Sequence, residues 1–175
     1  MKLLVIDGNS ILNRAFYGIR PLSTKEGLPT NAVYGMTNIL WGKIEQYKPD
    51  YAAVAFDLKA PTFRHKEYDQ YKANRHGMPD DLAAQLPYAK KCLEYMGFNV
   101  IELEGYEADD IIGTVSTLCE KSGIECLIAT GDKDDLQLAG EYTKILLTIT
   151  AMGSTQTTVY DKNTVFEKLG VTPYE

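Results

Sequence analysis

The chain has 175 residues, 45% of them hydrophobic, and a net charge of -6. This length and composition predict one folded domain with a complete core and exclude an intrinsically disordered chain. No run of about 20 apolar residues is present, which excludes a membrane-spanning helix and a membrane partner. The apolar stretch "LLVI" meets Asp7 too early for a signal peptide, so we expect a cytoplasmic protein.

Short apolar runs alternate with stretches of helical periodicity along the chain. The runs predict strands in residues 2–6, 51–56, 98–103, 124–130 and 144–149. The periodic stretches predict helices in about residues 9–19, 30–47, 80–96 and 162–169, and one more that carries the apolar stripe Ile111, Ile112, Val115, Leu118 and Cys119. This alternation predicts an α/β fold in which helices cover both faces of a central, mainly parallel sheet.

The chain has three cysteines, Cys92, Cys119 and Cys126, and no Cys-x-x-Cys pair. An odd number without such a pair favours neither a disulfide framework nor a thiolate zinc site. We therefore expect the cysteines to be small hydrophobic residues of the core.

Acidic residues follow four of the predicted strands. They are Asp7, Asp57, the cluster Glu107, Asp109 and Asp110, and the pair Asp132 and Asp134. Because the carboxyl ends of parallel strands share one edge of the sheet, we expect these side chains to converge there. Such convergence requires cations, and Mg²⁺ prefers oxygen ligands. The sequence therefore predicts a pair of divalent metals, an arrangement that can cleave a phosphodiester bond.

Each of these acids also has a structural interpretation, which the sequence leaves open. The cluster at residues 107–110 lies at a predicted helix N-terminus, where carboxylates satisfy free N–H groups and the helix dipole favours them. For Asp132 the sequence favours a helix cap, with Asp135 three residues later in a capping-box-like arrangement. Asp7 and Asp57 are common residue types in turns.

The segment of residues 58–81 is locally basic and intersperses its cations, among them Arg64, with aromatic residues. Phosphates attract cations and unstacked bases stack on aromatic rings, so this segment is expected to bind nucleic acid. Thr30 and Asn31 are placed as caps of the next helix, whose free N–H groups would hold a phosphate.

Seven motifs in this order resemble the 5′ nuclease domain of bacterial DNA polymerase I and the related flap endonucleases. They are "LLVIDGNSILNRAFYG", "TNAVYG", "FDLKAPTFRH", "YKANR", "MPDDLAAQL", "GYEADDIIGT" and "TGDKD". The resemblance implies a three-layer, PIN-like 5′ nuclease fold. It also implies hydrolysis of DNA, or of an RNA primer, at a free 5′ end or flap during replication and repair, with two Mg²⁺ or Mn²⁺ ions.

The resemblance also assigns roles to individual residues. The acids that correspond to its metal ligands are Asp7, Asp57, Glu107, Asp109, Asp110, Asp132 and Asp134. Lys72 and Arg75 match basic residues that contact the scissile phosphate, and Tyr71 is expected to stack on a base. These three residues and Arg64 form the expected nucleic-acid contacts, together with Thr30 and Asn31.

The segment Thr172–Glu175 has the pattern of a helix start, with a capping residue, a proline and an acid three residues after the cap. In the family a helix-hairpin-helix region follows and supplies further aspartates to the second metal site. We therefore expect residues 1–175 to be a monomeric catalytic domain that lacks this region, with reduced activity, and a polymerase domain is its expected C-terminal neighbour. A DNA-binding module without catalysis is the alternative.

Overall fold

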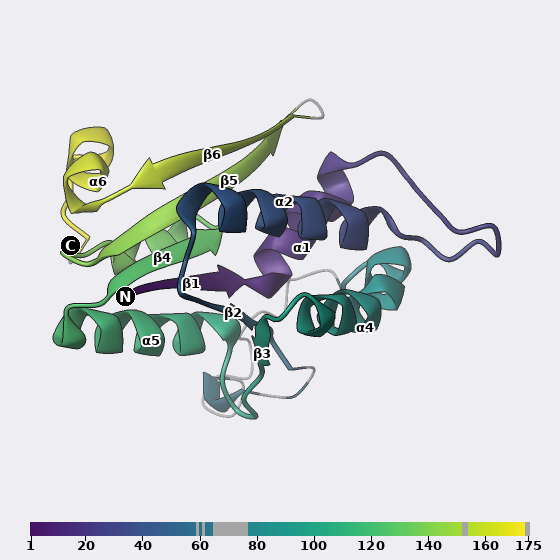
Figure 1. The fold of residues 1–175 in the computed structure, drawn as a ribbon, viewed down its shortest axis with the longest axis horizontal. Coiled ribbons are helices and arrows are strands. Elements are labelled where there is room, and N and C mark those ends of the chain that lie inside the picture. The colour runs from purple at the N-terminus through teal and green to yellow at the C-terminus, as the bar shows by residue number, and fades with distance from the viewer. Residues whose placement is uncertain (59, 61, 65–76, 152–153, 174–175) are drawn as a thin grey trace.

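The computed structural model describes residues 1–58, 60, 62–64, 77–151 and 154–173, and within them six strands form one sheet (Figure 1). The strands are β1 (Lys2–Asp7), β2 (Tyr51–Ala55), β3 (Asn99–Ile101), β4 (Glu125–Thr130), β5 (Thr143–Ala151) and β6 (Ser154–Tyr160). They are ordered β3-β2-β1-β4-β5-β6. All neighbours are parallel except β5 and β6. The predicted, mainly parallel central sheet is confirmed.

Helices cover both faces of this sheet (Figure 1). One face carries α1 (Gly8–Gly18), α2 (Asn31–Tyr47) and α4 (Asp80–Tyr95). The other carries α5 (Ala108–Ser122), the 3₁₀ helix η1 (Asp134–Leu138) and α6 (Lys162–Leu169). Among the described helices, none combines the length and apolarity needed to cross a bilayer. The architecture is the three-layer α/β fold that the sequence predicts.

The central strand β1 is buried on both faces because its apolar residues alternate between the two layers. Leu4 and Ile6 pack with α1, α2 and α4, whereas Val5 packs with α5. Each such side chain contributes about 1.5–3 kcal/mol when it is fully buried. The two cores fix the strand from both sides, and with it the position of Asp7 at its end.

The predicted helices and the first five strands are confirmed, but the sequence analysis missed β6. Its residues "STQTTVY" are largely polar, and the strand forms by antiparallel pairing with the apolar β5. Cys119 and Cys126 are buried as expected, and Cys92 is half-buried. The expected helix start at Thr172–Glu175 includes residues 174–175, which lie outside the described residues.

The N–H groups at the start of α2 are not free to hold a phosphate, contrary to the expectation from the sequence, because a side chain accepts their hydrogen bonds. The Gln85 side chain on α4 is 0% exposed, and its Oε1 accepts hydrogen bonds from the backbone of Ala32 at 2.8 Å and Val33 at 3.3 Å. Its Nε2 donates to Asn31 Oδ1, while Asn31 Nδ2 donates to the Phe16 carbonyl. Thr30 occupies the N-cap position without a side-chain hydrogen bond. A residue of α4, rather than a ligand, satisfies this helix end.

We predict that Gln85→Leu lowers the free energy of unfolding by about 2–4 kcal/mol, because it leaves the N–H groups of Ala32, which is buried, and Val33, which is half-buried, without their acceptor. Urea unfolding followed by circular dichroism measures this loss. The matched change Gln137→Leu alters an exposed glutamine and should stay within about 0.5 kcal/mol of the wild type. Equal losses in the two variants would contradict the capping role of Gln85.

Candidate metal centre

A cavity of about 610 Å³ opens at the carboxyl edge of the sheet. Strand β1 lies between β2 and β4 in the sheet. Strands β2 and β3 are added on one side of β1, and β4 to β6 are added on its other side. Open α/β sheets bind ligands at such a switch point. The cavity is lined by Asp7, Asn9, Ser10, Asn13, Arg14, Tyr17, Asp57, Glu107, Ala108, Asp109, Gly131, Asp132 and Lys133.

Asp7 occupies the centre of this edge and is only 5% exposed. It ends β1 and is the N-cap of α1, where its Oδ1 accepts a hydrogen bond from the Ser10 backbone at 3.0 Å. Its Oδ2 accepts one from the Thr130 hydroxyl at the end of β4, at 3.3 Å. Backbone and neighbouring strand therefore hold the carboxylate in one orientation.

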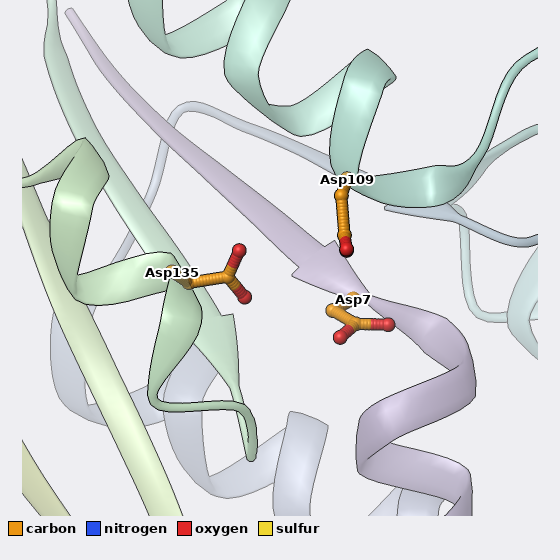
Figure 2. Close-up of side chains that lie close together, drawn as sticks. All are labelled: Asp7, Asp109 and Asp135. Carbon is orange, nitrogen blue, oxygen red and sulfur yellow. The ribbon is translucent and has the colours of Figure 1, made fainter. Parts of the chain in front are cut away.

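Three carboxylates from three elements meet at this point (Figure 2). One oxygen each from Asp7, Asp109 and Asp135 lies within 4.8 Å of the others. Asp135 is 4% exposed, and among the described residues its Oδ2 has no hydrogen-bond partner. A buried carboxylate oxygen without a hydrogen-bond donor is costly unless a cation compensates its charge, so this oxygen fits a cation site.

The sequence analysis placed Asp134 in this site, but the structure brings in Asp135 instead. Asp134 is exposed and does not line the cavity, and its backbone N–H donates to Asp132 Oδ1. Successive side chains of a 3₁₀ helix point about 120° apart, so Asp134 and Asp135 cannot both face the sheet. No local sequence signal separates these two adjacent acids, and of the two only Asp135 is buried in η1.

Burial and mutual repulsion raise the pKa of two of these carboxyl groups. Burial raises the pKa of Asp7 to about 7; the Ser10 N–H opposes this shift, and the charges of Asp135, Asp109 and Asp57 add to it. Burial also raises the pKa of Asp135 to about 6. A cation bound here would stabilise the charged carboxylates and so oppose both effects, which means that metal ions and protons compete for this site.

Asp57 fixes the relative position of three elements. Its Oδ1 accepts a hydrogen bond of 2.7 Å from the backbone of Ala108, the first residue of α5. Its Oδ2 accepts one from the Asn9 amide on α1, and the Asp57 backbone donates to Asn9 Oδ1. The carboxylate therefore joins the end of β2 to both helices while it lines the cavity.

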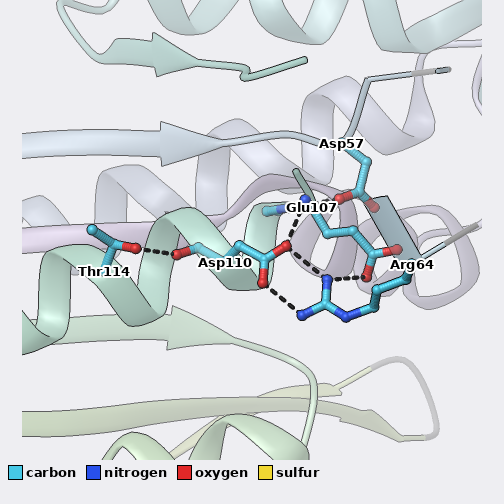
Figure 3. Close-up of polar contacts among 6 residues, drawn as sticks. Asp57, Arg64, Glu107, Asp110 and Thr114 are labelled. Carbon is cyan, nitrogen blue, oxygen red and sulfur yellow. Dashed lines mark hydrogen bonds and ion pairs between the residues drawn. The ribbon is translucent and has the colours of Figure 1, made fainter. Parts of the chain in front are cut away.

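Glu107 and Asp110 form a capping box at the start of α5 (Figure 3). The Glu107 backbone donates to Asp110 Oδ2 at 3.0 Å. Both oxygens of Asp110 also accept from the Arg64 guanidinium, each at 2.7 Å, and Arg64 lies 3.9 Å from Glu107. The structural interpretation of this acidic cluster is therefore correct for Asp110, whereas Asp109 points toward Asp7 (Figure 2).

The structure brings together most of the predicted metal ligands. Those that line the cavity are Asp7, Asp57, Glu107, Asp109 and Asp132. Asp110 is next to it, in its ion pair with Arg64, a residue that was expected to contact nucleic acid. Tyr71, Lys72 and Arg75 lie outside the described residues. The sequence analysis did not select Asp135, Thr130 or the two cations of the cavity, Arg14 and Lys133.

The donor set fits a hard divalent cation. All the carboxylate ligands offer oxygen, and no cysteine or histidine lines the described part of the cavity. Oxygen ligands suit Mg²⁺ and Mn²⁺, whereas zinc sites typically use nitrogen and sulfur. The buried Oδ2 of Asp135 supplies the orphaned acceptor that such an ion would satisfy.

We predict that Asp7 makes the metal-free protein less stable as the pH rises. Its pKa is about 7 in the folded state against 3.8 for the ordinary group, so folding favours the protonated form. That contribution is fully present below pH 3.8 and is lost as the pH rises through 7. Relative to Asp7→Asn, the wild type in EDTA should lose about 4 kcal/mol of unfolding free energy between pH 4 and pH 8. Urea unfolding of both proteins at the two pH values measures the difference, and parallel pH profiles would contradict it.

Comparison with known sequences identifies relatives along nearly the whole chain. The model of the family described as 5′-3′ exonuclease, N-terminal resolvase-like domain, matches residues 2–170. DNA polymerase I of Caldicellulosiruptor bescii is 44% identical over 171 residues, which are 98% of this chain and 20% of that protein. A 5′-3′ exonuclease of Aquifex aeolicus is 40% identical over 171 residues, or 98% of this chain and 57% of that protein. The chain thus spans about a fifth of the polymerase relatives.

Solved structures show the same fold at low sequence identity. The bacteriophage T5 flap endonuclease, in a complex with DNA and metal ions, superposes with a TM-score of 0.72 at 18% identity, over 98% of this chain and 61% of that one. The catalytic core of Rad2 gives a TM-score of 0.54 at 16% identity, over 98% and 51%. These neighbours confirm the PIN-like fold. With its sequence match over residues 2–170, the chain belongs to the family of 5′-3′ exonuclease N-terminal, resolvase-like domains.

Proposed function

We propose that residues 1–175 form the catalytic part of a metal-dependent 5′ nuclease. It hydrolyses phosphodiester bonds at 5′ ends and flaps of DNA, or of an RNA primer, during replication and repair. The observation that carries this proposal is the convergence of Asp7, Asp109 and Asp135 within 4.8 Å beside a cavity of about 610 Å³. The volume of this cavity lies in the range of about 300–1,000 Å³ that is typical of ligand-binding sites.

The relatives support the same activity. The Aquifex aeolicus protein is named a 5′-3′ exonuclease, and the T5 neighbour was solved with both DNA and metal ions. In the proposal, Mg²⁺ or Mn²⁺ is the natural cofactor, and two ions bind in the complete enzyme. Further ligands for the second ion, from a helix-hairpin-helix region beyond residue 175, stay a prediction.

The described residues have distinct tasks in this proposal. Asp7, Asp109 and Asp135 hold a cation, and Asp57 keeps α5 and α1 in register with them. The ions that these carboxylates would hold would supply the chemistry of the reaction, namely an activated water molecule and stabilisation of the leaving oxygen. Arg14 lines the cavity and places positive charge where a phosphate would enter. Lys133 is a second cation at the same cavity.

The basic segment keeps its proposed role in substrate binding. Lys72 and Arg75 contact the scissile phosphate and Tyr71 stacks on a base, as the family resemblance implies. Arg64 orders the start of α5 through Asp110, so its contribution to nucleic-acid binding is indirect in the described state. A monomer in the cytoplasm, joined to a polymerase domain in the full-length protein, completes the proposal.

The alternative is a structure-specific DNA-binding module without catalysis. Five carboxylates that line one cavity would repel a phosphate backbone unless cations neutralised them. A module that only binds DNA has no use for such a cluster, so the site favours a nuclease.

We predict that Asp109→Asn lowers the rate of flap cleavage at least about a thousandfold, because a metal ligand contributes several kcal/mol of transition-state stabilisation. Single-turnover cleavage of a labelled 5′-flap DNA, with Mn²⁺ and with EDTA, measures the rate. The matched variant Glu94→Gln changes an exposed carboxylate on α4 and should cleave like the wild type. Flap binding by the wild type without cleavage in any metal would favour the DNA-binding module.

We predict further that Mn²⁺ raises the melting temperature of the wild type, since it binds only the folded state. Asp135→Asn should weaken this binding at least about tenfold, because a buried carboxylate of the triad loses its charge. Asp134→Asn, which changes the exposed neighbour, should bind Mn²⁺ like the wild type. Thermal melting at several Mn²⁺ concentrations compares the three proteins. A larger effect at Asp134 than at Asp135 would contradict the triad.

A further inference from the structure

A second cavity, of about 350 Å³, lies between α1, α2 and the strand β6. Its lining residues, which define the α1–α2–β6 groove, are Arg14, Ala15, Gly18, Ile19, Gly35, Asn38, Ile39, Gly42, Lys43, Gln46, Thr155 and Thr157. The groove is separate from the metal cavity, and the two share only Arg14 among their described lining residues.

Lys43 is the unusual residue of this groove because it is 4% exposed. Its Nζ donates one hydrogen bond, to Thr157 Oγ1 at 2.9 Å. Among the described residues, no carboxylate lies within ion-pair distance of it. A buried ammonium without an anionic partner destabilises a fold, so its presence requires a reason.

The pKa of Lys43 stays above neutral pH although the residue is buried. Burial lowers its pKa to about 8, which leaves most molecules protonated at pH 7. Within the described part of the chain the ammonium uses one of its three donors, so the groove presents a positive charge with two further donors.

The rest of the groove is suited to an anion rich in oxygen. The chain has 24 acidic and 18 basic residues, yet neither Asp nor Glu is among the described residues that line the groove. Arg14 adds a second cation, and Asn38 and Gln46 add amide donors. A water molecule occupies roughly 30 Å³. The groove volume of about 350 Å³ is many times larger and admits a tetrahedral phosphate.

Arg14 connects this groove to the metal cavity. Its Nη2 donates to the Gly131 carbonyl at 2.7 Å, directly before Asp132. A Cβ at residue 131 would lie 2.6 Å from Arg14 Nε, so glycine at this position leaves room for the guanidinium. Because Arg14 lines both cavities, an anionic strand that contacts Arg14 lies next to both of them.

We propose that the α1–α2–β6 groove binds a backbone phosphate of the nucleic acid, through Lys43 and Arg14, at a distance from the metal centre. This inference rests on the proposed function, because it takes the ligand of the groove to be the substrate of that site. Free inorganic phosphate offers the same chemistry, and the experiment separates the two sources.

The decisive measurement is the salt dependence of 5′-flap DNA binding in EDTA. Each neutralised phosphate contributes about 0.7–0.9 to the slope of log affinity against log salt. Lys43→Met should therefore make the slope shallower by about one and weaken binding several-fold at low salt. Lys91→Met removes an exposed lysine from α4 and should leave the slope unchanged. An unchanged slope in Lys43→Met overturns the proposal.

Thermal melting in EDTA tests the same site with inorganic phosphate, against potassium chloride at equal ionic strength. Without phosphate, Lys43→Met should melt above the wild type, because a buried charge is removed. Phosphate should raise the melting temperature of the wild type and of Lys91→Met, but not that of Lys43→Met. Stabilisation by phosphate that depends on Lys43, combined with an unchanged DNA slope, would identify a site for free phosphate and overturn the backbone assignment.

A second pair of variants tests the groove without altering Lys43. A Cβ at Gly42 meets no atom within 4 Å, so the site accepts a side chain. Gly42→Glu places a negative charge in the groove and should lower DNA affinity in the same way, while the neutral Gly42→Gln should lower it much less. Equal effects of the two would overturn an electrostatic role. Because all these measurements use EDTA, a failure of metal-dependent cleavage bears on the proposed function alone.

Discussion

Asp7 is a carboxylate buried at the end of the central strand, and the rest of the site is arranged around it. Asp109 and Asp135 approach it from α5 and η1, although three negative charges at this separation repel one another. The parallel ladders from β1 to β2 and β4, and the apolar layers on both faces, hold the strand in place against that repulsion. The free energy of the core therefore maintains a site that is unfavourable without cations.

The start of α5 shows how capping and function combine at one helix end. Asp57 accepts from the Ala108 backbone, while Glu107 and Asp110 form the capping box and Arg64 neutralises Asp110. The helix dipole favours negative charge at this end. These contacts leave Asp109 as the acid that faces Asp7. Capping therefore accounts for Glu107 and Asp110, whereas Asp109 of the same turn lies with Asp7 and Asp135 in the candidate metal site.

The sequence predicted the features that depend on local pattern. Hydrophobic runs located the five parallel strands, and the rule that ligands bind at their carboxyl ends located Asp7, Asp57 and Asp109. The prediction from sequence failed where a residue or strand far away in the chain determines the local structure. Gln85 caps a helix that begins 54 residues earlier in the chain. Strand β6 is largely polar, and it forms by antiparallel pairing with β5. The choice of Asp135 over Asp134 depends on the rotation of a short 3₁₀ helix, which composition does not specify.

The net charge of -6 would argue against a nucleic-acid ligand if it were evenly spread, but helix α1 separates opposite charges. Its 11 residues span about 16 Å, with Asp7 at the N-terminus and the groove of Lys43 beside its second half. The dipole of α1 favours an anion at its start and a cation near its end. That effect is worth about 0.3–1 kcal/mol, too little to compensate for either buried charge. The burial of apolar side chains in the two cores must therefore compensate for the cost of burying Asp7 and Lys43. The stability of the fold is in this way linked to the charges that would bind metal and phosphate.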